Sequence, residues 1–382
     1  MKKSNLFYLV SILLGFAMML TSCDKDDDPV IPGDEPENFQ GEITGAVTLD
    51  AATKYILTGA LVVKEGGTLN IPAGTVIEAV GGQIAYIAVA QGGKINVNGT
   101  ADNPVVMTSS DKTPGSWGGL VICGKAPTNK ADAGTAGAEV SGLPYGGTVA
   151  DDNSGSIQYL RVEYTGFNYS DTKQFNGVSF FGVGSGTTVD YVVSYNGKDD
   201  GLEFFGGTVN ASHLVSIGSD DDGIDFADGW SGTGEYWVSI NSTKSGIEGS
   251  NNGDDGAATP MTDATLRNIS VYGMGEKPFY FKEGSGKVNV DNIVIGGLVD
   301  TKQQPMFYAD DDDTDAAARI AAGDIVITSV KFLDLKAGQT QAFTGITFTE
   351  NAAATGAGNG IGKPDWLPDA LNTVKAGTKV IE

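Results

Sequence analysis

Histidine, cysteine and basic side chains are scarce in this chain of 382 residues. It contains one histidine, His213, and two cysteines, Cys23 and Cys123, and its 24 basic residues stand against 48 acidic ones. With a single histidine, and with Cys123 in the apolar run "GGLVICG", Ser-His-Asp and Cys-His catalysis are not expected. The net charge of −24 disfavours nucleic acid and anionic lipid surfaces as partners, because both repel an acidic protein.

Runs that favour helices are also few. Only Ala316–Ala322 ("AAARIAA") and Pro368–Val374 have a helical composition, whereas 55 glycines are spread through the chain. Short apolar–polar alternations separated by Gly, Asn, Asp or Ser are typical of strands and turns. An all-β fold is therefore predicted.

One long apolar run is present, at the N-terminus. Leu6–Leu20 follows two lysines, and its 15 residues are too few for a membrane-spanning helix but typical of a signal peptide. The run ends in "LTSC", which resembles the lipobox of bacterial lipoproteins. The resemblance implies that Cys23 is lipidated and becomes the first mature residue. Residues 1–22 are therefore predicted to be a lipoprotein signal peptide.

An acidic segment, "DKDDDPVIPGDEPEN", follows Cys23, and its composition cannot form a buried core. Residues 23–41 are predicted to be a flexible tether, and residues 42–382 a folded domain with a C-terminal cap. Acids directly behind the cysteine resemble the export signal of surface lipoproteins in Bacteroidetes. This resemblance implies a lipid anchor in the outer membrane and exposure at the cell surface. Without residues 1–22, which hold two lysines and no acid, the net charge is −26.

A short phrase recurs in the middle of the chain. "GVSFFG", "GLEFFGG", "GIDFADG" and "GIEG" begin at Gly177, Gly201, Gly223 and Gly246, at intervals of 24, 22 and 23 residues. Nearer the N-terminus, "KEGGTLNIPAGT" and "AQGGKINVNGT" align at an interval of 26 residues. Units of this length are too short for propeller blades of about 40–45 residues, and stacked units can share one core. The repeat predicts a parallel β-helix with coils of 22–26 residues.

The repeats resemble the right-handed parallel β-helices of the pectate-lyase-like superfamily. The block Gly99–Pro127 also resembles a segment of uncharacterised β-helix lipoproteins of Bacteroidetes. The resemblance implies the fold and the location, and it implies little about activity.

Alternation within the recurring strand predicts which side chains point outward. Val178, Leu202, Ile224 and Ile247 should point into the core, together with Phe180, Phe204 and Phe226. Outward positions on successive coils are then Ser179, Glu203, Asp225 and Glu248, and further aspartates occupy the turn before each strand. These acids are either solvated, or catalytic or sugar-binding, or ligands of Ca²⁺, which prefers carboxylate and carbonyl oxygens. The candidate metal ligands are Asp199, Asp200, Glu203, Asp221, Asp222 and Asp225.

Two enzymatic alternatives follow from the superfamily. Hydrolases resembling polygalacturonases would use Asp221, Asp222 and Asp225 as general acid and base, but the Gly-His-Gly and Arg-x-Lys elements that accompany such acids are missing. Lyases of this fold need a basic residue, and the nearest to the acids are Lys198 and Lys244. A polyanionic substrate is disfavoured by the charge. Enzymatic activity is therefore left open, with absence of activity preferred.

Binding is the preferred function. Aromatic residues expected on the outside can stack on sugar or peptide groups, unless they cover edges of the core. We expect a non-catalytic binding protein for a glycan or peptide nutrient, which acts as accessory to an outer-membrane import system of the starch-utilisation type. A structural or adhesive surface role is the third possibility. The candidate ligand-binding residues are Phe181, Phe205, Trp230, Tyr236 and Trp237.

Overall fold

The computed structural model describes residues 35–80, 82–131, 134–298, 307–309, 314–335 and 346–358. The predicted signal peptide, the lipidation site Cys23 and the helix expected at Pro368–Val374 lie outside these residues. No helix in the described part of the chain has both the length and the apolar character to cross a membrane.

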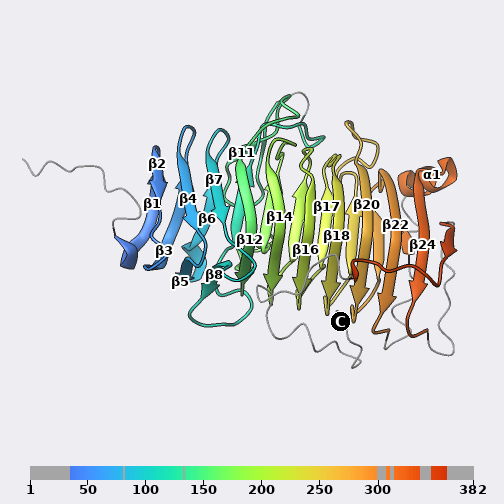
Figure 1. Cartoon of the computed structure of the whole chain (residues 1–382). Helices are drawn as coiled ribbons and strands as arrows, with labels where there is room; N and C mark the ends of the chain where they lie inside the picture. The colour runs from blue at the N-terminus through green and yellow to red at the C-terminus, as the bar shows by residue number, and fades with distance from the viewer. Residues whose placement is uncertain are drawn as a thin grey trace, which may run out of the picture. The chain divides into compact units, whose positions relative to one another are not determined.

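The domain is a right-handed parallel β-helix (Figure 1). Within the described residues its main sheet has 23 strands, and the strands pair in parallel with the equivalent strands of the next coil. The register reproduces the sequence repeat: Val178 pairs with Leu202, Leu202 with Ile224, and Leu69 with Ile95. The predicted fold and coil length are thus confirmed.

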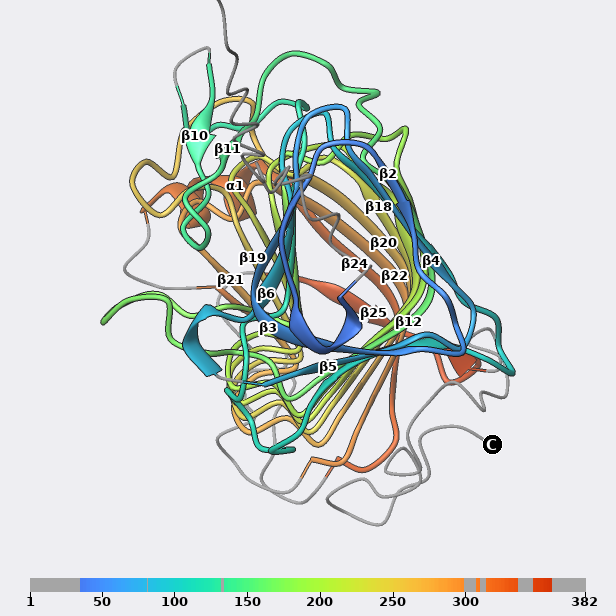
Figure 2. The ribbon, with the colours of Figure 1, turned by 90° about the vertical axis from the view of Figure 1, so that its left-hand side faces the viewer.

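Each coil has three faces, which are seen end on in Figure 2. The long strands of later coils supply two of the faces, since each bends near its middle. These strands are β12 (Gly155–Glu163), β14 (Thr188–Tyr195), β16 (Ala211–Ile217), β18 (Thr233–Ile240), β20 (Asp263–Tyr272), β22 (Lys287–Gly296) and β24 (Ile325–Phe332). The first halves continue β2 (Ala46–Thr48), β4 (Thr68–Pro72) and β7 (Lys94–Asn98). The second halves continue β3 (Lys54–Val63), β5 (Val76–Ala79) and β8 (Val105–Ser109), and end at β25 (Phe348–Glu350).

The third face is made of short strands and is called the site face below. It continues the second half of β3, on which β1 (Phe39–Ile43) also pairs. Its strands are β6 (Tyr86–Val89), β9 (Leu120–Cys123), β13 (Val178–Phe181), β15 (Leu202–Phe205), β17 (Ile224–Ala227), β19 (Ile247–Ser250), β21 (Phe279–Lys282) and β23 (Phe307–Ala309).

The bend in each long strand lies at a residue with positive φ. Tyr159, Tyr191, His213 and Tyr236 occupy it on four successive coils. The rings of these residues stack: the His213 ring lies 4.1 Å from that of Tyr191 and 5.0 Å from that of Tyr236. His213 Nδ1 also lies 2.6 Å from Asp190 Oδ1. The only histidine of the chain is therefore a strand residue at a bend.

The interior is filled by ladders of like side chains. Val178, Leu202, Ile224 and Ile247 are fully buried in one core cluster, as are Phe180, Phe204 and Phe226. On β19 the next inward position is Gly249, where an added Cβ would lie 2.4 Å from Cζ of Phe226. The predicted inward set is therefore confirmed. Gly249 leaves room for the ring of Phe226, and the next coil has a buried phenylalanine, Phe281, in the same register.

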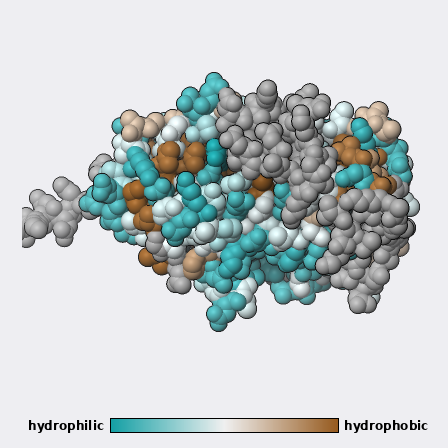
Figure 3. Space-filling model, turned by 90° about the horizontal axis from the view of Figure 1, so that it is seen from below, coloured by the Kyte–Doolittle hydropathy of each residue, from teal (hydrophilic) through white to brown (hydrophobic). Residues whose placement is uncertain are grey.

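Two smaller elements lie outside the coils. The hairpin of β10 (Ala136–Gly137) and β11 (Pro144–Tyr145) stands beyond the site face, as Figure 2 shows. Helix α1 (Thr314–Ala322) contains the predicted helical run. Short 3₁₀ turns cover Pro36–Asn38 and Gly82–Ile84. On the side drawn in Figure 3, hydrophobic side chains of the described residues form small separate groups among hydrophilic ones.

Candidate functional site

Two columns of side chains run along the outside of the site face. The first column contains the predicted acids, and it reads Ser179, Glu203, Asp225, Glu248 and Tyr280 on successive coils. The second column, two residues further along each strand, reads Cys123, Phe181, Phe205, Ala227, Ser250 and Lys282. The acidic column predicted from alternation is thus present in the structure, with a second column beside it.

A long connection between β9 and β12 forms one wall over this face. Its Tyr145 packs against the ring of Phe181, with ring centroids 5.1 Å apart, and donates a hydrogen bond to Asp228 Oδ2 at 3.3 Å. The same connection is held to the loop after β19 by Asn129, whose Nδ2 donates to Asn251 Oδ1 at 3.0 Å. Asn252 Nδ2 donates in return to Asn129 Oδ1. Because all three asparagines are buried, these bonds fix the wall in place.

A second loop, between β12 and β13, meets the hairpin across the face. Lys173 of this loop forms an ion pair with Glu139 of the connection between β9 and β12. Asn176 of the same loop is 3% exposed and donates from Nδ2 to Glu203 Oε2 and to Ser179 Oγ. The loop is therefore hydrogen-bonded to the first two residues of the acidic column, Ser179 and Glu203.

The strands and loops enclose two adjoining pockets. One has a volume of about 530 Å³ and is lined by Phe205, Ala227, Ser250 and Asp228, among others. The second has a volume of about 470 Å³ and is lined by Asp200, Asp222 and Glu248, among others. The two share Glu139, Lys173, Glu203, Asp225 and Lys282, so they form one acidic cleft. Both volumes fall in the range of about 300–1,000 Å³ that is usual for small-molecule sites.

Burial raises the pKa of the carboxyl groups in this cleft. The pKa of Asp225 rises to about 7, mainly through burial, with Lys282 opposing the shift and Asp222 adding to it. The pKa of Glu248 also rises to about 7, through burial and the neighbouring Asp225, again opposed by Lys282. Asp228 reaches a pKa of about 6 because it is buried, although Lys130 favours its charged form.

Carboxyl groups further along the cleft follow the same trend. The pKa of Glu203 is well above its ordinary value because the group is buried and faces Asp225. The pKa of Asp200 is raised by burial and by Asp222, and that of Asp222 by burial and by Glu248. Carboxyl groups whose pKa is raised by burial and by one another collect at functional sites more often than elsewhere.

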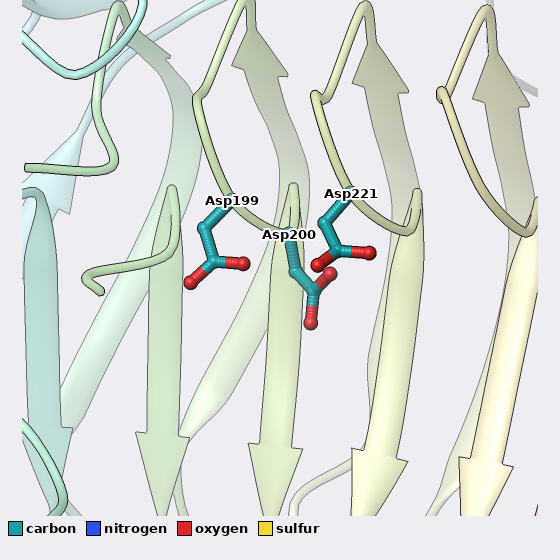
Figure 4. Close-up of side chains that lie close together, drawn as sticks. All are labelled: Asp199, Asp200 and Asp221. Carbon is teal, nitrogen blue, oxygen red and sulfur yellow. The ribbon is translucent and has the colours of Figure 1, made fainter. Parts of the chain in front are cut away.

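Two groups of carboxylates have the spacing to hold a cation. In one, oxygens of Asp200, Glu203 and Asp225 lie within 4.8 Å of one another, and all three residues are buried. In the other, Asp199, Asp200 and Asp221 converge from adjacent coils, as Figure 4 shows. The predicted metal set thus divides into two groups that share Asp200. Asp222 belongs to neither group, and its Oδ1 accepts a hydrogen bond from the Ser245 amide.

Comparison with known proteins identifies the family. The family model of the pectate-lyase like β-helix domain matches residues 41–370. The chain belongs to this family. No curated protein matches the chain at a significant level. The Dettilon tailspike protein, a solved structure, is similar over 80% of this chain with 10% sequence identity and a TM-score of 0.32. The chain spans 61% of that protein's length.

Most of the aromatic residues predicted to bind ligand are placed elsewhere in this pectate-lyase-like β-helix. Trp230 and Trp237 are fully buried in the core, where both contact Phe204, so the prediction for them is wrong. Tyr236 lies on β18, in the ladder with His213, and lines neither of the two pockets of the cleft. Phe181 points outward as predicted, but Tyr145 covers it and leaves it 1% exposed. Phe205 alone of the five combines a pocket-lining position with measurable exposure, 7%.

The residues predicted for hydrolysis lie along one edge of the cleft. Asp222 and Asp225 are buried there, whereas Asp221 is partly exposed and forms an ion pair with Lys244. The four lysines that line the cleft, Lys130, Lys173, Lys244 and Lys282, all have a raised pKa, which favours the protonated amine. The pKa of Lys282 is raised by Glu248 and Asp225, against the effect of burial, and the pKa of Lys173 is raised by its hydrogen bond to Glu139. Both amines are therefore protonated at neutral pH.

Of the five residues that both pockets share, three were not predicted from the sequence: Glu139, Lys173 and Lys282. Lys282 could have been found, because it lies in the register of Phe181 and Phe205 two coils beyond Ala227. Glu139 and Lys173 belong to long connections with no repeat, so no alternation or spacing indicates where they fold. Cys123 was predicted to be buried, and it is; burial raises its pKa to about 12.

Proposed function

We propose that this protein binds a glycan or a peptide in the acidic cleft without cleaving it, as a lipid-anchored surface protein that serves an outer-membrane import system. The observation that supports binding is the pair of adjoining pockets on the site face, which combine an aromatic ring, buried carboxyl groups and protonated lysines. Such a mixture of one apolar surface with a few polar groups is typical of ligand sites.

The arrangement of the acids supports the same proposal. Like charges directly opposite one another on adjacent strands destabilise a sheet, and here Glu203 lies opposite Asp225. Neighbouring loops add both carboxyl groups and lysines, and the carboxyl groups that line the two pockets outnumber the lysines. A cluster that opposes folding is expected where it serves a ligand, because function commonly costs stability.

Binding and turnover are tested on the same purified protein. On glycan and peptide arrays the protein should retain at least one ligand class, and that ligand should be recovered intact after prolonged incubation. Asp225→Asn should weaken the binding by about tenfold or more, because a hydrogen bond to a charged group is worth about 1.5–3 kcal/mol. Breakdown of a polysaccharide without retention on either array would replace the proposal by the hydrolase alternative.

One observation favours that hydrolase alternative. Asp225 and Glu248 lie on adjacent coils of the cleft and both have a pKa of about 7, which suits a general acid at neutral pH. If the protein hydrolyses glycosidic bonds, Asp225→Asn and Asp222→Asn should each abolish turnover while Tm changes little or rises. Activity that survives both substitutions would exclude these residues as the acid and base.

A divalent cation is the second ligand that the donor set fits. We propose Ca²⁺ at Asp200, Glu203 and Asp225, whose oxygens converge in a buried position and are the kind of ligand that Ca²⁺ prefers. A ligand that binds only the folded state raises stability, so millimolar Ca²⁺ should raise Tm relative to a chelator. The rise should be absent in Glu203→Gln. Equal Tm values of the parent protein with Ca²⁺ and with chelator would rule the cation out.

A further inference from the structure

The aromatic column of the site face stops within the cleft. Phe181 and Phe205 stack face to face, with ring centroids 4.1 Å apart and an angle of 7° between the planes. On the next two coils the same position is held by Ala227 and Ser250, and only the third coil has a long side chain again, Lys282. The column therefore contains a slot two coils wide, with the ring of Phe205 at one end and Lys282 at the other.

The slot opens into one of the two pockets of the cleft, where Phe205 is 7% and Ala227 9% exposed. Phe205, Ala227, Ser250 and Lys282 all line the pocket of about 530 Å³. On the strand spacing of about 4.8 Å, Phe205 and Lys282 are separated by roughly 14 Å along the column. A ring placed over Ala227 would lie about 4.8 Å from Phe205, which is a stacking distance. A ligand ring in the slot would thus continue the stack that the protein begins.

The walls of the slot are polar at the height of such a ring. Glu203 and Asp225 of the first column form one side, and Asp228 lies on the other. The lysines nearby are engaged: Lys130 with Asp254 at 2.7 Å and with Asp228 at 4.0 Å, and Lys282 with Glu248. Each wall carboxyl group accepts one hydrogen bond from the protein: Glu203 from Asn176, Asp225 from the Phe226 amide and Asp228 from Tyr145. A carboxyl group has two oxygens with several acceptor sites, so each can also accept a hydrogen bond from the ligand.

The ring of Phe205 and the carboxyl groups of the walls together determine which class of ligand fits. An aromatic side chain of a peptide would satisfy the face of Phe205, but its apolar edge would meet carboxyl groups and leave them without donors. A sugar ring has an apolar face and an edge of hydroxyl or amino donors. A uronic acid would place its own carboxylate among those of the protein. A pyranose ring without a carboxylate can stack on the face of Phe205 and donate hydrogen bonds to the carboxyl groups of the walls.

We propose that the slot over Ala227 and Ser250 is a subsite for one pyranose ring that carries hydroxyl or amino groups and no carboxylate, stacked on Phe205. This inference rests on the proposed binding function and narrows its ligand from a glycan or peptide to this class of sugar.

The test fills the slot from the protein side. Ala227→Phe adds the ring that the column lacks, stacked on Phe205, and should reduce the affinity for glucosamine oligomers or neutral gluco-oligosaccharides at least tenfold. Ala51→Phe, which adds the same ring at an exposed turn before β3, should bind as the parent protein does. Phe205→Leu, which keeps an apolar side chain but removes the flat face, should also weaken binding at least tenfold. Both slot variants are compared by titration calorimetry after their Tm has been measured.

The outcomes separate the inference from the proposed function. If oligosaccharides bind and Ala227→Phe retains full affinity while Asp225→Asn loses it, the cleft binds glycans but the slot inference is wrong. Binding of galacturonate oligomers, or of aromatic peptides in place of sugars, also overturns the inference. If no oligosaccharide and no peptide binds, both the inference and the proposed function fail. If Ala227→Phe does not fold, the affinity of Phe205→Leu is the test. Full oligosaccharide affinity in that variant shows that no sugar ring stacks on Phe205 and overturns the inference.

Discussion

Asp225→Asn is expected to stabilise the protein at pH 8 and to flatten its pH dependence. The pKa of Asp225 is about 7 in the folded protein, against about 3.9 in an unfolded chain. Because the folded state holds the proton more tightly, the contribution of this group is fully present below pH 4 and is lost as the pH rises through 7. Between pH 5 and pH 8 that loss is about 3 kcal/mol for Asp225 alone. The asparagine variant lacks the charge and should avoid the loss.

The measurement is chemical denaturation of the parent and the variant at pH 5 and at pH 8. The parent should be more stable at pH 5, and the difference between the two proteins should be largest at pH 8. Asp291→Asn is the matched control, because a hydrogen bond from Thr328 lowers the pKa of Asp291 and the carboxylate is favoured in the folded state. That control should gain no stability at pH 8. A parent protein that is more stable at pH 8 than at pH 5 would contradict the account of the cleft.

Phe204→Ala is expected to lower the free energy of unfolding by about 3–5 kcal/mol, the usual cost of truncating a buried phenylalanine. The Phe204 ring is fully buried and stacks on Phe180 at 4.8 Å between centroids. It also contacts Trp230 at 4.9 Å and Trp237 at 5.6 Å. The three large rings that surround it cannot all move into the space that Phe204 leaves, so a cavity should remain.

The control for this substitution is Val149→Ala. Val149 is 44% exposed, and its truncation should change the free energy of unfolding by no more than about 0.5 kcal/mol. Denaturant titration of the two variants is done at pH 5, where Asp225 and Glu248, with a pKa of about 7, are largely protonated. The loss of core packing is then measured apart from the charge of these two acids. A loss below about 1 kcal/mol in Phe204→Ala would mean that the aromatic ladder is not a main source of stability.

The sequence was sufficient to predict the coils and the outward acids. Both follow from periodicity, since a repeat of 22–26 residues predicts stacking and strand alternation predicts which side chains face outward. The pairing of Glu203 with Asp225 confirms that alternation. Alternation alone does not predict the bend in the long strands. At the bend, a residue with positive φ interrupts the alternation of inward and outward side chains. Tyr236 and Trp237 follow one another at such a bend, which turns Tyr236 outward and Trp237 into the core.

The walls of the cleft could not be predicted in the same way. Glu139, Lys173 and Tyr145 lie on connections that occur once, and their positions depend on contacts such as those of Asn129 with Asn251 and Asn252. These contacts join residues more than a hundred positions apart. A periodic pattern gives no information about such pairings. The predicted outward acids thus gave the position of the cleft. The structure was needed to show that the connections between β9 and β12 and between β12 and β13 form its walls.

We infer that the acids of the site face serve a ligand and do not stabilise the fold. The most direct test is calorimetric titration of the parent and of Asp225→Asn at pH 8 with the array ligand of highest signal. We expect the variant to bind the ligand at least tenfold more weakly, although it unfolds at a higher denaturant concentration. Undiminished affinity in a variant that has gained stability would contradict it.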